Sequence, residues 1–226
     1  MIRLENLCKT FWTRGRRKVV ADNINLILPT GASVGLLGRN GAGKSTLLEI
    51  VAGTASADSG RVITDGNISW PVGFSGSFHR DMTGAQNVRF IARVYGVDTE
   101  ELVAFAEDFA ELGQHFHMPI RSYSSGMKSR LAFGLSMGIK FDTYLVDETM
   151  SVGDARFKMK ARAVFNHRMA NSGALVVTHS MAQLKEYCEA GAVLEGGHLY
   201  YYDKLDDAIE HHKYNMGAEN ESDDDD

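Results

Sequence analysis

The segment that most constrains this chain is a glycine-rich stretch at residues 38–46. It reads Gly-Arg-Asn-Gly-Ala-Gly-Lys-Ser-Thr and fits the pattern G-x-x-x-x-G-K-[ST] at every fixed position. The apolar run 32–37 before it predicts a buried strand, and residues 46–51 after it predict a helix. Backbone N–H groups at the start of a helix attract anions, and glycine lets them approach closely. The segment therefore predicts a strand, a phosphate-binding loop and a helix, which is the opening of an α/β fold.

Each residue type in this stretch is expected to make a different contact with a triphosphate. Lys44 brings a compact positive charge to the β- and γ-phosphates, and the Ser45 hydroxyl is a ligand for Mg²⁺. The glycines leave room for phosphate oxygens against the backbone. The residues expected to contact the nucleotide here are Gly38, Asn40, Gly41, Ala42, Gly43, Lys44, Ser45 and Thr46.

The composition of the chain limits the class of protein and the number of domains. The chain has 226 residues, 44% hydrophobic and 23% charged, which suits one α/β domain with at most a small subdomain. Its net charge of −5 comes from the six acids between residues 219 and 226, so the rest is close to neutral. We expect residues 214–226 to form an acidic, disordered tail. Cys8 and Cys188 lack metal or redox spacing, and no apolar run reaches the length of a membrane span.

Hydrophobic spacing along the chain predicts the order of the remaining elements. Strands are expected over 2–7 and 19–28 around a basic turn, with a strand pair between 59 and 70. The middle is helical, over 86–95, 100–112 and 126–138. Two apolar strands, 143–146 and 174–177, flank a further helix, which is the spacing of a parallel sheet. A last strand pair (191–195 and 198–202) and a helix over 204–213 follow. The order predicts a mostly parallel sheet with an inserted helical lobe at about 75–138.

Charged and polar side chains follow two of the predicted strands. Asp147 and Glu148 end the first apolar strand, and His179 comes directly after the second. Since the carboxyl ends of parallel strands meet at one edge of a sheet, all three should lie near the phosphate loop. Asp147 is then placed to bind Mg²⁺, and Glu148 to orient or deprotonate the attacking water. We assign Glu148 and His179 as the catalytic residues.

A second phosphate-binding element is predicted at a helix start. Residues 124–128 read Ser-Ser-Gly-Met-Lys, with hydroxyl caps followed by a glycine that exposes backbone N–H groups. Together with the phosphate loop, the Asp-Glu strand end and the late histidine, this order resembles the ATP-binding subunit of ABC transporters. The corresponding family motif is Leu-Ser-Gly-Gly-Gln. Ser124 and Gly126 keep its two phosphate-contacting positions, whereas Tyr123, Ser125 and Met127 depart from it.

Longer stretches are similar to a narrower group, the ATPases of bacterial capsular polysaccharide exporters. They are residues 69–73, 123–130, 146–157 and 178–181, and the resemblance covers about 2–213. It implies a P-loop NTPase fold with a RecA-like core, an antiparallel β subdomain and the helical lobe, all within a nucleotide-binding domain at 1–213. It also implies ATP and Mg²⁺ as cofactors and an aromatic residue, Phe11 or its neighbour Trp12, stacked on adenine. Both aromatics could instead belong to the core.

One family feature is missing from the sequence. Most ABC ATPases have a glutamine between sheet and helical lobe, but this chain has Gly-Phe-Ser at 73–75. Gln86 lies too far along the chain and opens a helix. The loop 71–81, with apolar Phe74 and Phe78, is the expected groove for a membrane partner, although both rings could instead pack inside the lobe.

The resemblance also implies partners and a location. These are a second copy of the ATPase in a homodimer, integral membrane permease subunits, and a periplasmic-facing polysaccharide export co-factor protein, with no nucleic acid. The chain would then work at the cytoplasmic face of the bacterial inner membrane. Exporters of O-antigen or teichoic acid are the nearest alternative. A soluble ABC-type ATPase acting on DNA or the ribosome is disfavoured, since there is no coiled-coil insertion, second ATPase unit or basic surface. A phosphate-loop kinase does not need residues 124–128.

Overall fold

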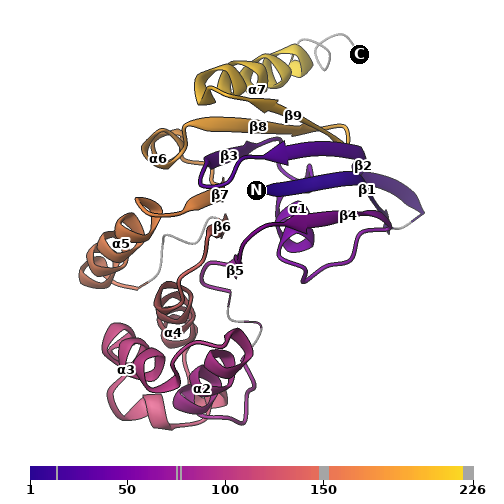
Figure 1. Cartoon of the computed structure of the whole chain (residues 1–226). Coiled ribbons are helices and arrows are strands. Elements are labelled where there is room, and N and C mark those ends of the chain that lie inside the picture. Colours follow the sequence, from indigo (N-terminus) through magenta and orange to yellow (C-terminus); the bar gives the residue numbers. More distant parts are fainter. Residues whose placement is uncertain (14, 75, 77, 148–152, 221–226) are drawn as a thin grey trace. The chain divides into compact units, whose positions relative to one another are not determined.

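The structure is a computed structural model that describes residues 1–13, 15–74, 76, 78–147 and 153–220 (Figure 1). It contains two compact units, which are described separately. The core unit is built from Met1–Pro71, Phe141–Glu148 and Asn171–Asp226. The helical unit is built from Val72–Lys140 and Thr149–Ala170. Both units therefore use segments that are distant in the sequence.

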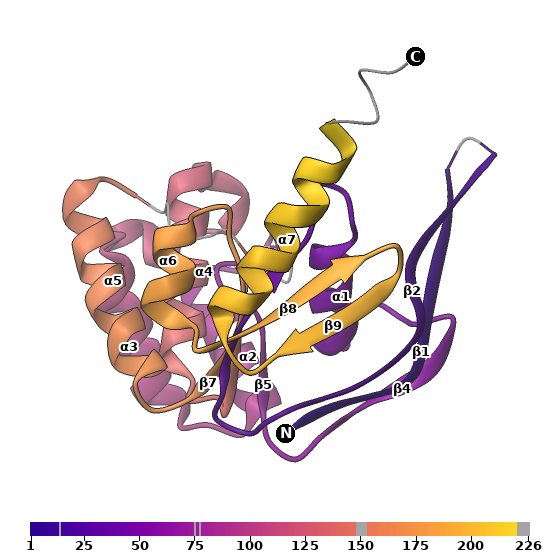
Figure 2. The same ribbon diagram turned by 90° about the horizontal axis from the view of Figure 1, so that it is seen from above.

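The first sheet of the core unit is antiparallel, in the order β2–β1–β4. Strand β1 covers Ile2–Thr13, β2 covers Arg16–Leu28 and β4 covers Ser59–Thr64. The hairpin of β1 and β2 is longer than the predicted strands, and its arms reach the basic turn (Figure 2). Irregularities in register interrupt this pairing between Leu4 and Thr10, where the side-chain alternation breaks.

The second sheet has the order β5–β6–β7–β3–β8–β9 and is parallel except for the edge strand β9. Its strands are Ile68–Pro71 (β5), Thr143–Asp147 (β6), Gly173–Val177 (β7), Ser33–Leu37 (β3), Ala190–Glu195 (β8) and His198–Tyr202 (β9). The predicted pairing of two strands between 59 and 70 is wrong, because β4 and β5 belong to different sheets. The predicted α/β class, with one mostly parallel and one antiparallel sheet, is confirmed.

Three helices complete the core unit. Helix α1 (Lys44–Val51) follows the phosphate loop, and α6 (Met181–Tyr187), which the sequence analysis did not predict, follows β7. Helix α7 spans Leu205–Asn220 and packs on β8, β3 and β9 (Figures 1 and 2). It therefore continues through 214–220, so the prediction of a disordered tail from residue 214 is wrong for this part. The Asn215 amide binds the Glu195 carboxylate, which helps to keep this part helical.

The helical unit contains the four helices α2 (Gly84–Tyr95), α3 (Thr99–Ala110), α4 (Ser125–Gly138) and α5 (Ala155–Met169). Two short 3₁₀ turns lie between α3 and α4. Its core is aromatic: the Phe109 ring stacks on Phe133 with centroids 5.8 Å apart and meets Phe157 edge-on at 5.3 Å. Among the described residues, no helix has both the length and the apolar character that crossing a membrane requires.

Candidate functional site

The phosphate loop joins β3 to α1 in the core unit, and its glycines are needed for packing as well as for ligand access. Gly38, Gly41 and Gly43 all have positive φ angles, of 151°, 80° and 108°. A Cβ on Gly38 would lie 2.5 Å from the carbonyl oxygen of Leu194, and one on Gly43 would overlap the side chain of Val20. Strands β8 and β2 thus hold the loop in a form that only glycine can adopt.

Lys44 is the most buried charged residue of the loop, with 9% of its surface exposed. Its ammonium group donates hydrogen bonds to the carbonyl oxygens of Gly38, at 2.7 Å, and Arg39, at 3.0 Å. The lysine therefore closes the loop over itself, with its charge at the centre of the loop.

A cavity of about 250 Å³ lies beside the loop, within the core unit. Its lining residues are Lys18, Asn40, Gly41, Gly43, Lys44, Ser45, Thr46, Val177 and His179. The fold thus brings His179, predicted from its strand end, beside Lys44 and Ser45. Lys18, which belongs to the predicted basic turn, also lines the cavity. The signal that identifies it is its register in the β1–β2 hairpin.

That register also separates the two candidate aromatic residues. Phe11 pairs directly with Lys18, and Trp12 pairs with Arg17. Directly paired residues of an antiparallel ladder share a face, so Phe11 shares the face of Lys18, which lines the cavity. Trp12 lies on the opposite face. Both are exposed, at 40% and 72%, so the alternative that they are core residues is wrong. The Lys9 ammonium lies 5.1 Å from the Phe11 ring centroid.

Asp147 ends β6 at the same sheet edge as His179. It pairs with Val177 of β7, and β7 is the neighbour of β3, which leads into the phosphate loop. The segment after β7 is ordered by Thr178, whose hydroxyl bonds Gln183 at 2.8 Å, and by Ser180, which caps α6. Glu148, the predicted catalytic base, lies outside the described residues.

The donor chemistry at this edge fits Mg²⁺. Ser45 offers a hydroxyl oxygen in the cavity and Asp147 a carboxylate, and hard divalent cations prefer such oxygen ligands together with phosphate oxygens. The described part of the chain contains no group of three or more His, Cys, Asp and Glu side chains arranged to hold a metal.

The second predicted phosphate contact lies at the start of α4 in the helical unit. Ser124 caps this helix, accepting a hydrogen bond from the Met127 backbone N–H at 3.2 Å. A Cβ on Gly126 would meet only the Ser124 hydroxyl, at 3.9 Å, so the helix start is open. Tyr123 is buried, and its hydroxyl donates to the His115 carbonyl oxygen at 2.6 Å. Burial raises the pKa of Tyr123.

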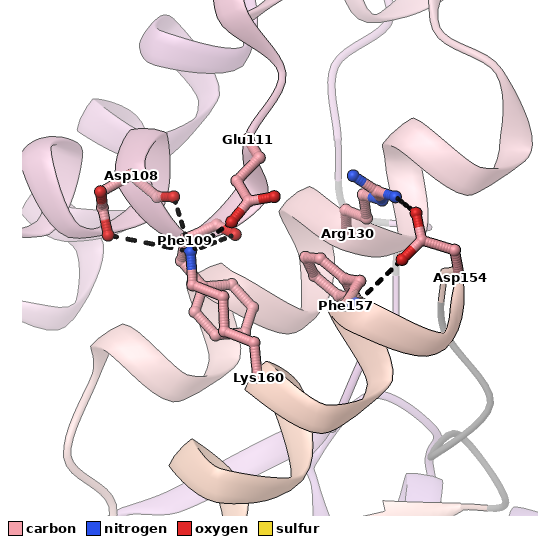
Figure 3. Close-up of polar contacts among 7 residues, drawn as sticks. All are labelled: Asp108, Phe109, Glu111, Arg130, Asp154, Phe157 and Lys160. Carbon is pink, nitrogen blue, oxygen red and sulfur yellow. Dashed lines mark hydrogen bonds and ion pairs between the residues drawn. The ribbon is translucent and has the colours of Figure 1, made fainter.

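Two cations fasten α5 to the rest of the helical unit (Figure 3). Arg130 of α4 pairs with Asp154 at 2.7 Å and lies over the Phe157 ring. The Asp154 carboxylate also accepts the Phe157 N–H and so caps α5. One turn later, Lys160 donates to the Asp108 carbonyl oxygen and to the Glu111 carboxylate, each at 2.9 Å. The start of α5, which follows the segment carrying Glu148, is therefore anchored to α4.

The loop proposed for a membrane partner is only partly as predicted. Phe74 is 45% exposed, but Phe78 is 8% exposed and belongs to the core of the helical unit. The expectation that Phe78 lines a groove is therefore wrong, because its ring packs inside. Ser75 lies outside the described residues.

Comparison with known proteins supports one family. Residues 21–151 match the family model described as ABC transporter. The chain is 48% identical over 216 residues to the polysialic acid transport ATP-binding protein KpsT of Escherichia coli, covering 94% of this chain and 96% of that protein. It is 42% identical to the capsule polysaccharide export ATP-binding protein CtrD of Neisseria meningitidis, covering 94% and 98%.

More distant matches agree on the fold. The chain is 33% identical to the O-antigen export system ATP-binding protein RfbB of Myxococcus xanthus, covering 83% of this chain but 46% of that protein. Among solved structures, the ATP-binding cassette MJ0796, in a dimeric post-hydrolysis state bound to ADP and Pi, superposes with a TM-score of 0.71. The superposition covers 91% of this chain and 99% of the MJ0796 chain, and the two sequences are 21% identical. This likeness therefore concerns the fold alone.

Proposed function

Because this chain belongs to the ABC transporter family, we propose that it is the ATP-hydrolysing subunit of a bacterial exporter of capsular polysaccharide. The observation that carries the proposal is the cavity beside the phosphate loop, where Lys18, Lys44, Ser45 and His179 gather around space for a polyphosphate. The substrate class comes from the relatives at 42–48% identity, which are named for polysialic acid or capsule export. The O-antigen alternative is not favoured, since that relative is less similar.

The proposed roles follow from the chemistry of each side chain. Lys44 neutralises phosphate charge, and the backbone N–H groups of the loop bind phosphate oxygens. Ser45 and Asp147 would hold Mg²⁺, which neutralises charge on the β- and γ-phosphates. Glu148 is the general base, and His179 contacts the γ-phosphate. Phe11 stacks on adenine, since its register places it on the Lys18 face of the hairpin.

The proposed partners follow from the family. ABC ATPase domains work as dimers with membrane permeases in transporters, and the solved relative is dimeric. For this chain we propose a homodimer on permease subunits at the cytoplasmic face of the inner membrane, with a periplasmic-facing export co-factor protein in the same assembly. Ser124 and Gly126 of one copy would contact the nucleotide on the other. Phe74 is the remaining candidate for the permease contact in residues 71–81, since it is half exposed.

Co-purification from membranes tests the proposal. The tagged chain, expressed in a capsulated host lacking its own export ATPase, should retain an integral membrane protein on solubilisation and restore surface polysaccharide. Phe74→Ser should reduce retention and export several-fold while leaving ATP hydrolysis by the isolated chain unchanged. Lys44→Ala should retain the permease but abolish export. Restored O-antigen without restored capsule, or an isolated wild-type chain that does not hydrolyse ATP, would contradict the proposal.

A further inference from the structure

The phosphate loop also lines a second cavity, which has no role in the proposed reaction. It has a volume of about 230 Å³ and lies within the core unit. One wall is the loop itself, residues 38–42, and another is residues 193–196 at the end of β8. The remaining wall is His212 and Asn215 of α7. A titratable side chain of a distant helix thus lines the same cavity as the phosphate loop.

Close packing fixes α7 in this place. Its first turns bury Leu205 and Ala208 against the sheet, where β3 and β8 carry glycine. A Cβ on Gly35 would lie 3.1 Å from Leu205, and one on Gly191 would overlap Ala208. Since β3 leads directly into the phosphate loop, α7 is packed against the strand that positions the loop.

Polar contacts fix the later turns of the helix. Tyr202 of β9 and His211 share a hydrogen bond of 2.8 Å between the hydroxyl and Nδ1. The other ring nitrogen of His211 lies 3.6 Å from the Glu195 carboxylate, which also accepts from Asn215. His212 lies between these two anchored residues and is therefore held in the cavity wall.

The charges around His212 come from every side of the cavity. Burial lowers its pKa most, followed by the positive charge of Lys44, while the Glu195 carboxylate opposes the shift and His211 adds to it. Arg39 is a further charged residue in the lining. The positive charge of Lys44 is therefore one of the reasons that protonation of His212 is disfavoured.

A nucleotide bound to the loop would oppose the effect of the Lys44 charge on His212. Its phosphates bring negative charge to Lys44, which offsets the repulsion that a protonated His212 would experience. We propose that nucleotide binding at the phosphate loop is linked to uptake of a proton at the ring of His212. The proposal rests on the nucleotide site proposed above, and it adds a proton site in a second cavity that the same loop lines.

The direction of the effect follows from linkage. The pKa of His212 is lowered in the free protein and rises when phosphate binds, so binding takes up a proton between the two values. Nucleotide affinity should therefore rise as pH falls through that window, and should not change above the bound-state pKa. Charges separated by several ångströms in a partly solvated site give an expected gain of about three- to tenfold.

Calorimetry of ADP binding tests this proposal without measuring hydrolysis. In buffers of different ionisation enthalpy, at several pH values between about 5.5 and 8, the wild type should take up more protons per ADP than His212→Gln. Between about pH 8 and 5.5 its affinity should rise about three- to tenfold more than that of the variant. ADP's own titration cancels in this comparison. His198→Gln, which removes an exposed histidine of β9 outside the cavity lining, should behave as wild type.

A spectroscopic measurement covers the case in which His212→Gln is unstable. The NMR signal of the His212 ring in the wild type should titrate at a higher pH with ADP than without it. An unchanged titration, or equal proton uptake in wild type and His212→Gln, overturns the linkage while leaving the nucleotide site intact. A wild-type chain that does not bind ADP removes the proposed function together with the linkage.

Discussion

Lys44 holds the phosphate loop closed through two carbonyl oxygens of that loop, and it is also the residue proposed to receive the phosphates. Lys44→Ala should therefore weaken ADP binding by about tenfold or more, since hydrogen bonds to a charged group are worth about 1.5–3 kcal/mol. Lys18→Ala is the matched control: it removes an exposed cation from the same cavity and should cost less. Titration with a fluorescent ADP analogue measures both, and equal losses would contradict a special role for Lys44.

The proposed role of Glu148 as general base depends on its carboxylate. Replacing it with glutamine keeps the shape but removes the base. Glu148→Gln should bind ATP as the wild type does while turnover falls by about 10²-fold or more. Binding by equilibrium titration and phosphate release on the same samples separate the two effects. If Glu148→Gln hydrolysed ATP at the wild-type rate, another residue would be the general base, and His179 would be substituted next.

Glycines of the chain differ in what surrounds them. Gly43 has φ 108° beside Val20, whereas Gly53 has φ 72° with open space around its Cα. Alanine at Gly53 should cost only backbone strain, of about 1–3 kcal/mol. Gly43→Ala adds a clash, so it should unfold at a lower temperature and lose ADP binding. Adding Val20→Ala should restore part of the loss, and no restoration would assign the defect to the backbone alone.

The anchoring of α5 gives a prediction at the scale of an element. The pKa of Asp154 is held down first by the Phe157 N–H that it caps and then by the charge of Arg130. Asparagine retains a capping oxygen but not the charge, whereas alanine loses both. Melting temperatures should fall in the order wild type, Asp154→Asn, Asp154→Ala, with about 2–4 °C lost in the alanine variant.

The pH dependence of this series has a definite sign. A carboxylate with a lowered pKa stabilises the fold above its unfolded pKa, and the contribution is lost as pH falls through the folded value. The difference between wild type and Asp154→Asn should therefore be constant from neutral pH down to about 4 and vanish at more acid pH. A difference that persisted in acid would show that the charge of Asp154 contributes nothing to stability.

The success of sequence reasoning differs from element to element. Helices α2 and α4 were predicted within two residues from their apolar spacing, and in the structure local caps define their starts, Thr83 with Gln86 in one and Ser124 in the other. The partners of β4 and β5 were not predictable from alternation, which identifies a strand but not its neighbour. The end of α7 was missed because acidic composition suggested disorder, whereas a contact to Glu195, distant in sequence, helps to order it.

Across the whole molecule, features set by local sequence could again be predicted, whereas features set by distant contacts could not. Residues of the phosphate loop and of the ends of β6 and β7 could be predicted as candidate site residues because their spacing in the chain indicates the chemistry. Lys18 and His212 were missed as lining residues, since only strand pairing and the packing of α7 bring them to the loop. Sequence patterns therefore predicted candidate side chains whose place follows from local spacing, and missed lining residues that only long-range contacts bring to the loop.

At the scale of the whole molecule, we predict that two copies of the chain assemble into a dimer when ATP is bound. The phosphate loop belongs to the core unit and Ser124 to the helical unit, and two-fold symmetry would let each copy supply one of them to each nucleotide. Glu148→Gln with Mg-ATP should therefore double in mass by light scattering, and ADP should return it to monomer. Adding Ser124→Arg should prevent the dimer while leaving ADP affinity unchanged. A variant that stays monomeric with ATP bound would refute the shared site.

The position of β3 in its sheet has a consequence for how the protein is made. Its two neighbours, β7 and β8, are translated long after it, with the whole of Val72–Lys140 in between. A growing chain emerges from the ribosome amino end first, so the strand that carries the phosphate loop waits unpaired until almost the entire polypeptide is available. A nascent or prematurely terminated chain ending before residue 190 should consequently be unable to retain nucleotide. Translation must therefore be nearly complete before the chain can bind and hydrolyse ATP.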